Sequence, residues 1–390
     1  MNTTSKLLNH YLVKRRNTML GVGPMSKNCV DAAIEIVNKH RIPIFLIASR
    51  RQIESKNLGG GYCNNWNTES FSKYVLNKDK KKLILLSRDH GGPFQGNVEL
   101  EQKNNYHKTL KQAKESFKVD IDNDFKIIHI DTSFGLNKLI PQKKALEMLF
   151  ELYHFVCGYA KKRKKKILIE IGTEEQTGSV NSFKELEYFL NRVFNFCKLK
   201  KLQKPTFVVI QSGTKVMEMR NVGIFESPVR IKGQIPVEIQ LFKVLEICKK
   251  FNIFMKEHNA DYLTNDSLKW HPKIGIHAAN VAPEYGVAET LALIKLLKSN
   301  RQHKLLEEFL ELSYNSNKWK KWIIDLNKHK SDYEKSIISG HYVFSTEKFI
   351  NLKQKISKNI NLSIRDIDLI LKDSVKSSIL RYIENFGLLS

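Results

Sequence analysis

The chain of 390 residues has few cysteines, and their arrangement excludes several classes of protein. The five cysteines are odd in number and scattered, and no two have C-x-x-C spacing. This pattern argues for reduced thiols and against a disulfide framework or a cysteine-based zinc knuckle. The cysteines are Cys29, Cys63, Cys157, Cys197 and Cys248.

Long hydrophobic runs are also missing. Nowhere do 18 apolar residues follow one another, and residues 1–20 contain no apolar segment of signal-peptide length. The sequence therefore predicts a cytoplasmic protein that does not interact with a membrane. With 42% hydrophobic residues, we expect a globular chain with a large buried core.

Acidic residues are too few to balance the basic ones, since 40 Asp and Glu stand against 65 Lys and Arg. A nucleic-acid-binding protein usually gathers its basic residues on one face, with aromatic side chains for stacking or a recognised module. Here the lysines are spread over the predicted helices, and the densest run, residues 161–166, lies between a helical pattern and a strand pattern. We interpret the charge as solvated background, which argues against a nucleic-acid partner. Attraction of phosphorylated substrates, or weak nucleic-acid binding, is the alternative.

Eight short β-rich runs alternate with longer amphipathic stretches between residues 17 and 300. Parallel strands that are covered on both faces have continuous apolar sequences. The number of repeats and their total length predict an α/β fold, a closed (β/α)8 or TIM barrel. The alternative, an open doubly wound sheet, needs a glycine-rich phosphate turn after the first strand, where Pro24 removes a backbone donor. The predicted strands are residues 18–23, 43–48, 83–87, 125–131, 167–172, 207–211, 253–257 and 274–278.

After residue 300 the helical patterns continue without any strand pattern. We expect helices over residues 301–312, 317–328, 346–357 and 363–385, the last beginning with Ser363 and Asp366 as a capping pair. The sequence thus predicts a barrel over residues 1–300 and a helical C-terminal extension over residues 301–390. The extension packs on or beside the barrel, or serves as an oligomerisation surface.

Polar residues are dense at the carboxyl ends of the predicted strands, which in an α/β barrel converge on one mouth where the chemistry takes place. The most informative pair is Asp89-His90, which follows the apolar run of residues 83–86 and precedes Gly91-Gly92-Pro93. His258 is a second histidine at a strand end. Imidazole and carboxylate ligands suit Zn²⁺ and related divalent ions, so His90 and His258 are predicted metal ligands.

The remaining candidates have less specific signals. Glu170 is a further predicted metal ligand, although it could equally be an interior carboxylate paired with a basic residue. Asp89 and Glu174 are the candidates for proton transfer, and His129 is expected in the core. Arg50 and Arg51 are candidates for a phosphate clamp because a guanidinium matches phosphate oxygens. The predicted substrate-binding residues are Arg50, Arg51, Asp131, Ser133, Gln211, Asp261, His277, Asn280 and Glu284.

Two backbone features offer further binding possibilities. The glycines at residues 59–61 form either a flexible loop or a lid that lets the backbone approach a substrate. A phosphate could also bind at the amino terminus of the last barrel helix, near residues 280–286.

Six short motifs occur in order over residues 20–290. They are Gly59-Gly60-Gly61-Tyr62, Asp89-His90-Gly91-Gly92-Pro93, His129-Ile130-Asp131-Thr132-Ser133, Ile171-Gly172-Thr173-Glu174, Gln211-Ser212-Gly213 and His258-Asn259-Ala260-Asp261-Tyr262. In this order they resemble the subunit of class II D-tagatose-1,6-bisphosphate aldolase that is usually described as non-catalytic. Ser87 and Arg88 stand where that family has glycines, which indicates a divergent member with its own substrate.

The resemblance implies a TIM barrel and chemistry on sugars. The first hypothesis is a metal-dependent enzyme of aldolase or epimerase type that acts on a ketose phosphate or a related sugar. Its cofactor would be a divalent metal, zinc or else manganese or cobalt, that polarises a carbonyl. The alternative is a non-catalytic barrel subunit that stabilises a class II tagatose-bisphosphate aldolase partner. The expected partners are therefore a sugar or sugar phosphate, a catalytic aldolase subunit, or a second copy of the chain.

Overall fold

The computed structural model describes residues 3–101, 105–133, 140–172, 183–210, 215–222, 237–323 and 330–389. In these residues eight parallel strands form a closed barrel, and two further strands form a small antiparallel sheet. The barrel strands are β1 (Met19–Val22), β2 (Ile44–Ser49), β3 (Ile84–Gly91), β4 (Ile127–Ile130), β5 (Leu168–Gly172), β6 (Phe207–Ile210), β9 (Phe254–Glu257) and β10 (Ala278–Val281). The small sheet consists of β7 (Lys215–Met217) and β8 (Arg220–Val222).

The barrel closes in the order β1-β10-β9-β6-β5-β4-β3-β2. The predicted TIM barrel is therefore confirmed, and the open sheet is excluded. Seven predicted strands overlap the observed ones, although β3 extends beyond its predicted end, and the eighth, residues 274–278, is predicted too early in the chain. The preceding helix runs to Ile274, Gly275 ends it with a φ of 93°, and the strand starts only at Ala278.

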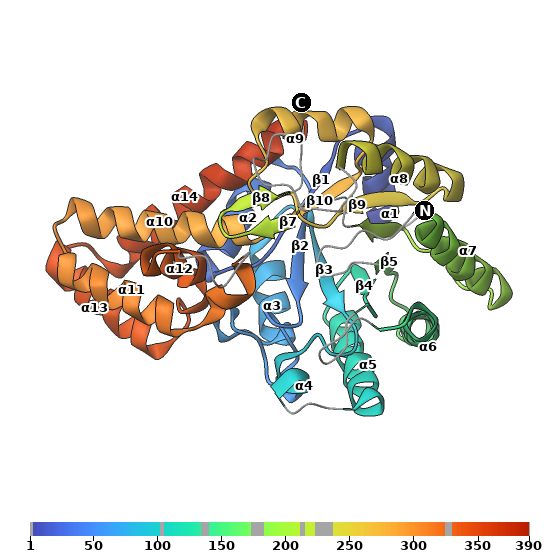
Figure 1. Cartoon of the computed structure of the whole chain (residues 1–390), viewed down its shortest axis with the longest axis horizontal. Coiled ribbons are helices and arrows are strands. Elements are labelled where there is room, and N and C mark those ends of the chain that lie inside the picture. Colours follow the sequence, from blue (N-terminus) through green and yellow to red (C-terminus); the bar gives the residue numbers. More distant parts are fainter. Residues whose placement is uncertain are drawn as a thin grey trace.

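Helices connect the strands and cover the outside of the barrel (Figure 1). They are α2 (Lys27–His40), α3 (Thr68–Lys78), α5 (Tyr106–Asp122), α6 (Gln142–Lys162), α7 (Phe183–Leu199), α8 (Val237–Phe251), α9 (Asn265–Ile274) and α10 (Pro283–Ser299). Shorter elements are α1 (Thr3–Leu8), a π-helical turn (Asn9–Lys14), α4 (Asn97–Glu101) and 3-10 turns at Lys56–Leu58 and Cys63–Asn65.

The extension consists of α11 (His303–Asn315), a 3-10 turn (Lys318–Trp322), α12 (Asp332–Ser339), a second 3-10 turn (Gly340–Tyr342), α13 (Glu347–Ile360) and α14 (Ile364–Asn385). The predicted capping pair at the start of α14 is confirmed, because Ser363 and Asp366 bond each other's backbone N–H groups. None of the helices in the described part of the chain combines the length and apolar composition of a membrane span.

Helix α14 joins the extension to the barrel. Its first half packs in an apolar cluster with α10, α11 and α13, and its second half, including Ile379 and Tyr382, belongs to the barrel core. It lies against both α2 and α10, and α10 contributes side chains to both clusters. A boundary between two domains at residue 300 therefore stays a prediction.

Candidate functional site at the barrel mouth

Polar side chains two residues apart line the inside of the barrel. Side chains alternate between the two faces of a strand, so residues i and i+2 point the same way. Asp89 on β3, His129 and Asp131 at β4, and Lys256 and His258 at β9 contact one another or their neighbours inside the barrel. The mouth is therefore a charged cluster above an apolar core.

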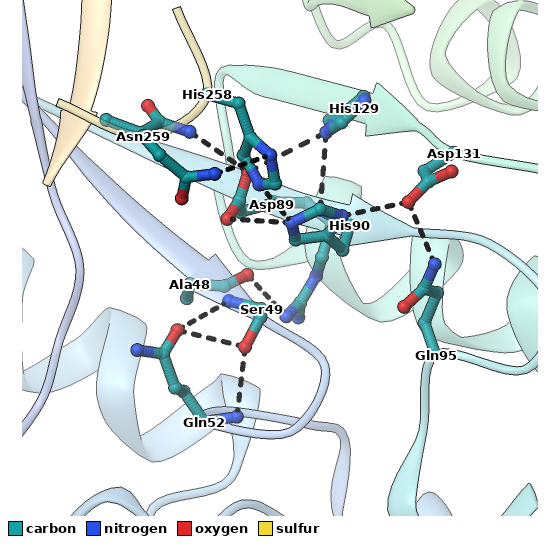
Figure 2. A network of polar contacts seen from close by, with 12 residues as sticks. Ala48, Ser49, Gln52, Asp89, His90, Gln95, His129, Asp131, His258 and Asn259 are labelled. Carbon is teal, nitrogen blue, oxygen red and sulfur yellow. Dashed lines mark hydrogen bonds and ion pairs between the residues drawn. The ribbon is translucent and has the colours of Figure 1, made fainter. Parts of the chain in front are cut away.

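His90 makes two short contacts within this cluster (Figure 2). Its Nδ1 lies 2.8 Å from Asp131 Oδ2, and its Nε2 lies 2.8 Å from His258 Nε2. The backbone of His90 is left-handed, with a φ of 44°, which is uncommon outside glycine and occurs often at functional sites. A carboxylate that accepts the Nδ1 proton leaves a lone pair on Nε2, as in histidines that bind metals or act as bases.

Other polar groups hold Asp131 in place. Gln95 Nε2 donates to its Oδ2 at 2.8 Å, and Ser133 donates to its Oδ1 through the backbone N–H at 3.0 Å and the hydroxyl at 2.6 Å. Burial would raise the pKa of Asp131, but the hydrogen bond and charge of His90 hold it at about 2. The predicted substrate-binding residues Asp131 and Ser133 thus orient His90.

Asp89 is a buried carboxylate that stays ionised. Its Oδ2 lies 3.9 Å from His90 Nε2, and its Oδ1 lies 3.7 Å from His129 Nδ1 and accepts from Asn280 Nδ2 at 3.3 Å. Burial would raise its pKa, but His90, His129 and Lys256 hold the pKa well below its usual range. The proton-transfer role expected of Asp89 from the sequence stays a prediction.

Glu170 lies deeper in the barrel than His90 and forms an ion pair. Both of its carboxylate oxygens are 3.0 Å from Lys256 Nζ, and both side chains are fully buried. Burial raises the pKa of Glu170 against the opposing charge of Lys256. This arrangement matches the alternative interpretation, an interior carboxylate with a basic partner, rather than a metal ligand. Sequence reasoning missed Lys256, although its two-residue spacing from His258 indicates the interior face.

Arg50 is fully buried, and its guanidinium is already bonded to other groups of the protein, so it is not available to bind a phosphate. Its guanidinium is paired with Glu54 and, at 2.6 Å, with Glu99, and it donates to the carbonyl oxygen of Gly92 at 2.6 Å. The clamp role expected for Arg50 is corrected accordingly, because its N–H groups tie the loop after β2 to the loop after β3.

Asp261 occupies the helix terminus at which a phosphate was expected. Its Oδ1 accepts from the N–H groups of Ala282 and Glu284, both at 2.9 Å, and so caps α10. Burial, together with the charge of Glu284, raises its pKa to about 7. Glu284 in turn accepts from the N–H of Tyr262 at 2.6 Å and from Arg381 at 2.8 Å, which fastens α14 to the mouth.

His277 lies at the opposite end of the barrel from the mouth. It precedes β10 instead of following a strand, and its Nδ1 accepts from the N–H of Met255 at 3.2 Å. Its expected role in substrate binding rested on the misplaced strand 274–278 and is corrected here. Glu174 and Gln211 lie outside the described residues.

The fit of a metal can be tested on the donors themselves. Ligands about 2.0–2.2 Å from a shared tetrahedral zinc ion are roughly 3.3 Å from one another. The His90 and His258 Nε2 atoms are 2.8 Å apart, which is shorter than this separation and is a hydrogen-bond distance. Across the described ranges no group of three or more His, Cys, Asp or Glu residues could hold a metal ion.

Together these features define a closed α/β barrel with an imidazole and carboxylate cluster at its mouth. No protein-family model matches the chain, and no curated protein matches it.

Solved structures do match. A probable tagatose 6 phosphate kinase from Sinorhizobium meliloti is 16% identical with a TM-score of 0.68, over 94% of this chain and 100% of that one. The YdjI aldolase from Escherichia coli K12 is 11% identical with a TM-score of 0.53, over 100% and 98%. The fructuronate-tagaturonate epimerase UxaE from Cohnella laeviribosi is 10% identical with a TM-score of 0.56, over 95% and 81%. These likenesses show the fold, which is the fold that the motif resemblance implies.

Proposed function

We propose that this chain is a companion subunit: a barrel that binds a phosphorylated sugar at its mouth and stabilises a separate class II aldolase subunit. The observation that carries the proposal is the buried ion pair between Glu170 and Lys256. In a metal-dependent enzyme, the Glu170 carboxylate was expected to bind the metal. Here it forms an ion pair inside the barrel instead. Arg50 likewise pairs with buried carboxylates instead of being available to a phosphate.

The fold comparisons also support a companion subunit that binds a phosphorylated sugar. The probable tagatose 6 phosphate kinase matches with a higher TM-score than the YdjI aldolase does. A phosphorylated sugar as ligand agrees with the name of that protein, and a companion role agrees with the six motifs.

The experiment is to mix the purified chain with a class II tagatose-bisphosphate aldolase catalytic subunit. We expect a complex in size-exclusion chromatography with light scattering, and a longer half-life of aldolase activity at elevated temperature. The His90→Ala variant should form the complex equally well, because a companion does not need a reactive imidazole. Absence of a complex at about 10 μM of each protein, with an unchanged half-life, would overturn the proposal.

A second candidate is a metal-dependent lyase or epimerase, which the pairing of His90 with His258 favours. A divalent ion bound there would polarise a ketose carbonyl. In this case Asp131 fixes the ring of His90, and the ionised Asp89 stands beside the two imidazoles.

Metal analysis of the pure protein separates the two candidates. An enzyme should hold stoichiometric Zn²⁺, Mn²⁺ or Co²⁺ and turn over at least one compound in a panel of ketose phosphates. His90→Ala should then lower metal content and activity together, while Asp89→Ala should lower turnover by about 10²-fold or more. The matched control is His154→Ala on α6, an exposed histidine whose loss should change neither. Equal metal content in the His90 and His154 variants would exclude this candidate.

A further inference from the structure

A second polar cluster lies where the loop after β2 meets the extension. Tyr62 of the loop packs against Tyr342 and His341, with ring centroids 4.9 and 6.3 Å apart. The two segments are also hydrogen-bonded, because the backbone N–H of Asn64 donates to the Ser345 hydroxyl at 2.7 Å. The barrel and the extension therefore build this place jointly.

Arg51 is a cationic residue of this cluster. Within the described ranges it forms no ion pair, whereas the adjacent Arg50 has two carboxylate partners. Burial lowers the pKa of Arg51, and the hydroxyls of Tyr342 and Tyr62 lie near its charge. A charge held partly out of water without a partner is costly, so an anion that completes the pairing would bind favourably.

His341 supplies the second, independent observation. It is 2% exposed, and neither of its ring nitrogens has a hydrogen-bond partner in the part of the chain that the structure describes. Buried polar groups in proteins are nearly always bonded, so an unbonded imidazole indicates a missing ligand or water. Burial lowers its pKa to about 3, which keeps the ring neutral with one N–H to donate. Its ring lies against Gly286 of α10, where a Cβ would be 2.6 Å from His341 Cγ, so it sits beside the mouth.

Lys321 adds a second cation from the extension. Its Nζ lies 5.3 Å from the centre of the Tyr342 ring and 4.4 Å from that of Trp322. The Tyr342 hydroxyl accepts from Trp322 Nε1 at 3.2 Å, so its own proton can be donated to a ligand.

We propose that Arg51, Lys321 and His341, with the hydroxyl of Tyr342, bind the phosphoryl group of a phosphorylated sugar. Two cations suit a dianion, and a guanidinium matches two phosphate oxygens at once. The neutral imidazole and the Tyr342 hydroxyl supply the donors for the remaining oxygen. The inference rests on the proposed function only in taking the ligand to be a sugar phosphate. It makes the helical extension a part of the binding site.

The test is isothermal titration of the full chain with inorganic phosphate at constant ionic strength. We expect saturable binding with one site per chain. Arg51→Met should weaken it about 10- to 100-fold, the value of a hydrogen bond to a charged group. Lys321→Met should weaken it about 5-fold. Lys320→Met is the matched control, because it removes the same charge from the same 3-10 turn beside Trp319 and should stay within about 2-fold.

Thermal unfolding without phosphate separates binding from a structural role. Arg51→Met removes a partly buried cation without a counterion, so its Tm should equal or exceed that of the wild type while phosphate no longer raises it. Lys321 is exposed, so its variant remains a test if Arg51→Met fails to fold.

Three results would overturn the inference: no saturable phosphate binding below about 10 mM, equal effects of the Lys320 and Lys321 variants, or acetate bound as tightly as phosphate. The assay contains no aldolase, so phosphate binding at Arg51 without a complex refutes the companion role alone.

Discussion

Lys256→Met tests the buried ion pair beneath the mouth. Lys256 Nζ lies 3.0 Å from both oxygens of Glu170, and neither side chain is exposed. Replacing the lysine leaves a carboxyl group in the interior without its cation, which costs about 3–5 kcal/mol in the free energy of unfolding. Burial already raises the pKa of Glu170, so the unpaired carboxyl binds a proton in the folded state more readily than in the unfolded state. The loss of stability should therefore be larger at pH 8 than at pH 5.

The assay is urea unfolding followed by both circular dichroism and tryptophan fluorescence. Two probes are needed because a chain of this length can unfold in more than one step. The double variant Lys256→Met/Glu170→Leu should recover most of the loss, because an apolar pair of similar volume replaces the buried charges at little or no cost. The control is Lys269→Met, whose ion pair with Asp266 is exposed and should contribute less than about 1 kcal/mol.

Two results would refute this reasoning. One is a loss below about 1 kcal/mol for Lys256→Met. The other is a double variant whose loss equals the sum of the two single losses, because independent sites add and coupled sites do not.

Two further predictions concern packing and pH. Gly92→Ala should lower the free energy of unfolding by about 1–3 kcal/mol, since its Cβ would lie 1.8 Å from the Asp131 carbonyl oxygen. The control is Gly158→Ala in α6, where a Cβ meets nothing within 4 Å. It should raise the free energy of unfolding by about 0.5–1 kcal/mol in the same urea assay. Burial raises the pKa of Glu289 from 4.5 to about 7. The contribution of the protonated side chain to the stability of the folded state is therefore complete at low pH and is lost as the pH rises through 7. Glu289→Gln should therefore raise the Tm at pH 8 by more than at pH 5; a difference independent of pH would contradict this.

The strands could be predicted because a covered parallel strand is an apolar run. The limit of this signal shows at β3, which was predicted to end at residue 87 but continues to Gly91. Arg88 is inside the strand because its guanidinium bonds both Asp120 oxygens, at 2.8 and 2.6 Å, and the carbonyl of Ala48. Nothing near Arg88 in the sequence indicates these distant partners, so the apolar run alone predicted a strand that ends at residue 87.

The site was predictable to the extent that strand ends meet at one mouth, which brings His90 and His258 together. The use of each group was not predictable, because it depends on partners far away in the chain. Glu170 and Lys256 are 86 residues apart, and only the register of the closed barrel sets them face to face. Asp261 could be placed near the mouth, but its role as the cap of α10 depends on where β10 ends.

Helix α14 has a consequence for the order in which the molecule can form. The Asn17 side chain donates to the carbonyl oxygen of Gly387 at 2.7 Å, although the two residues are 370 positions apart in the chain. The backbone N–H of Thr18 donates to the carbonyl oxygen of Phe386. During synthesis β1 and α2 leave the ribosome long before α14, the helix that covers them. The nascent chain therefore carries an exposed apolar face on α2 until α14 has been made, a condition that favours aggregation and gives chaperones a surface to bind. Synthesis that stops shortly before α14 would leave that face exposed permanently.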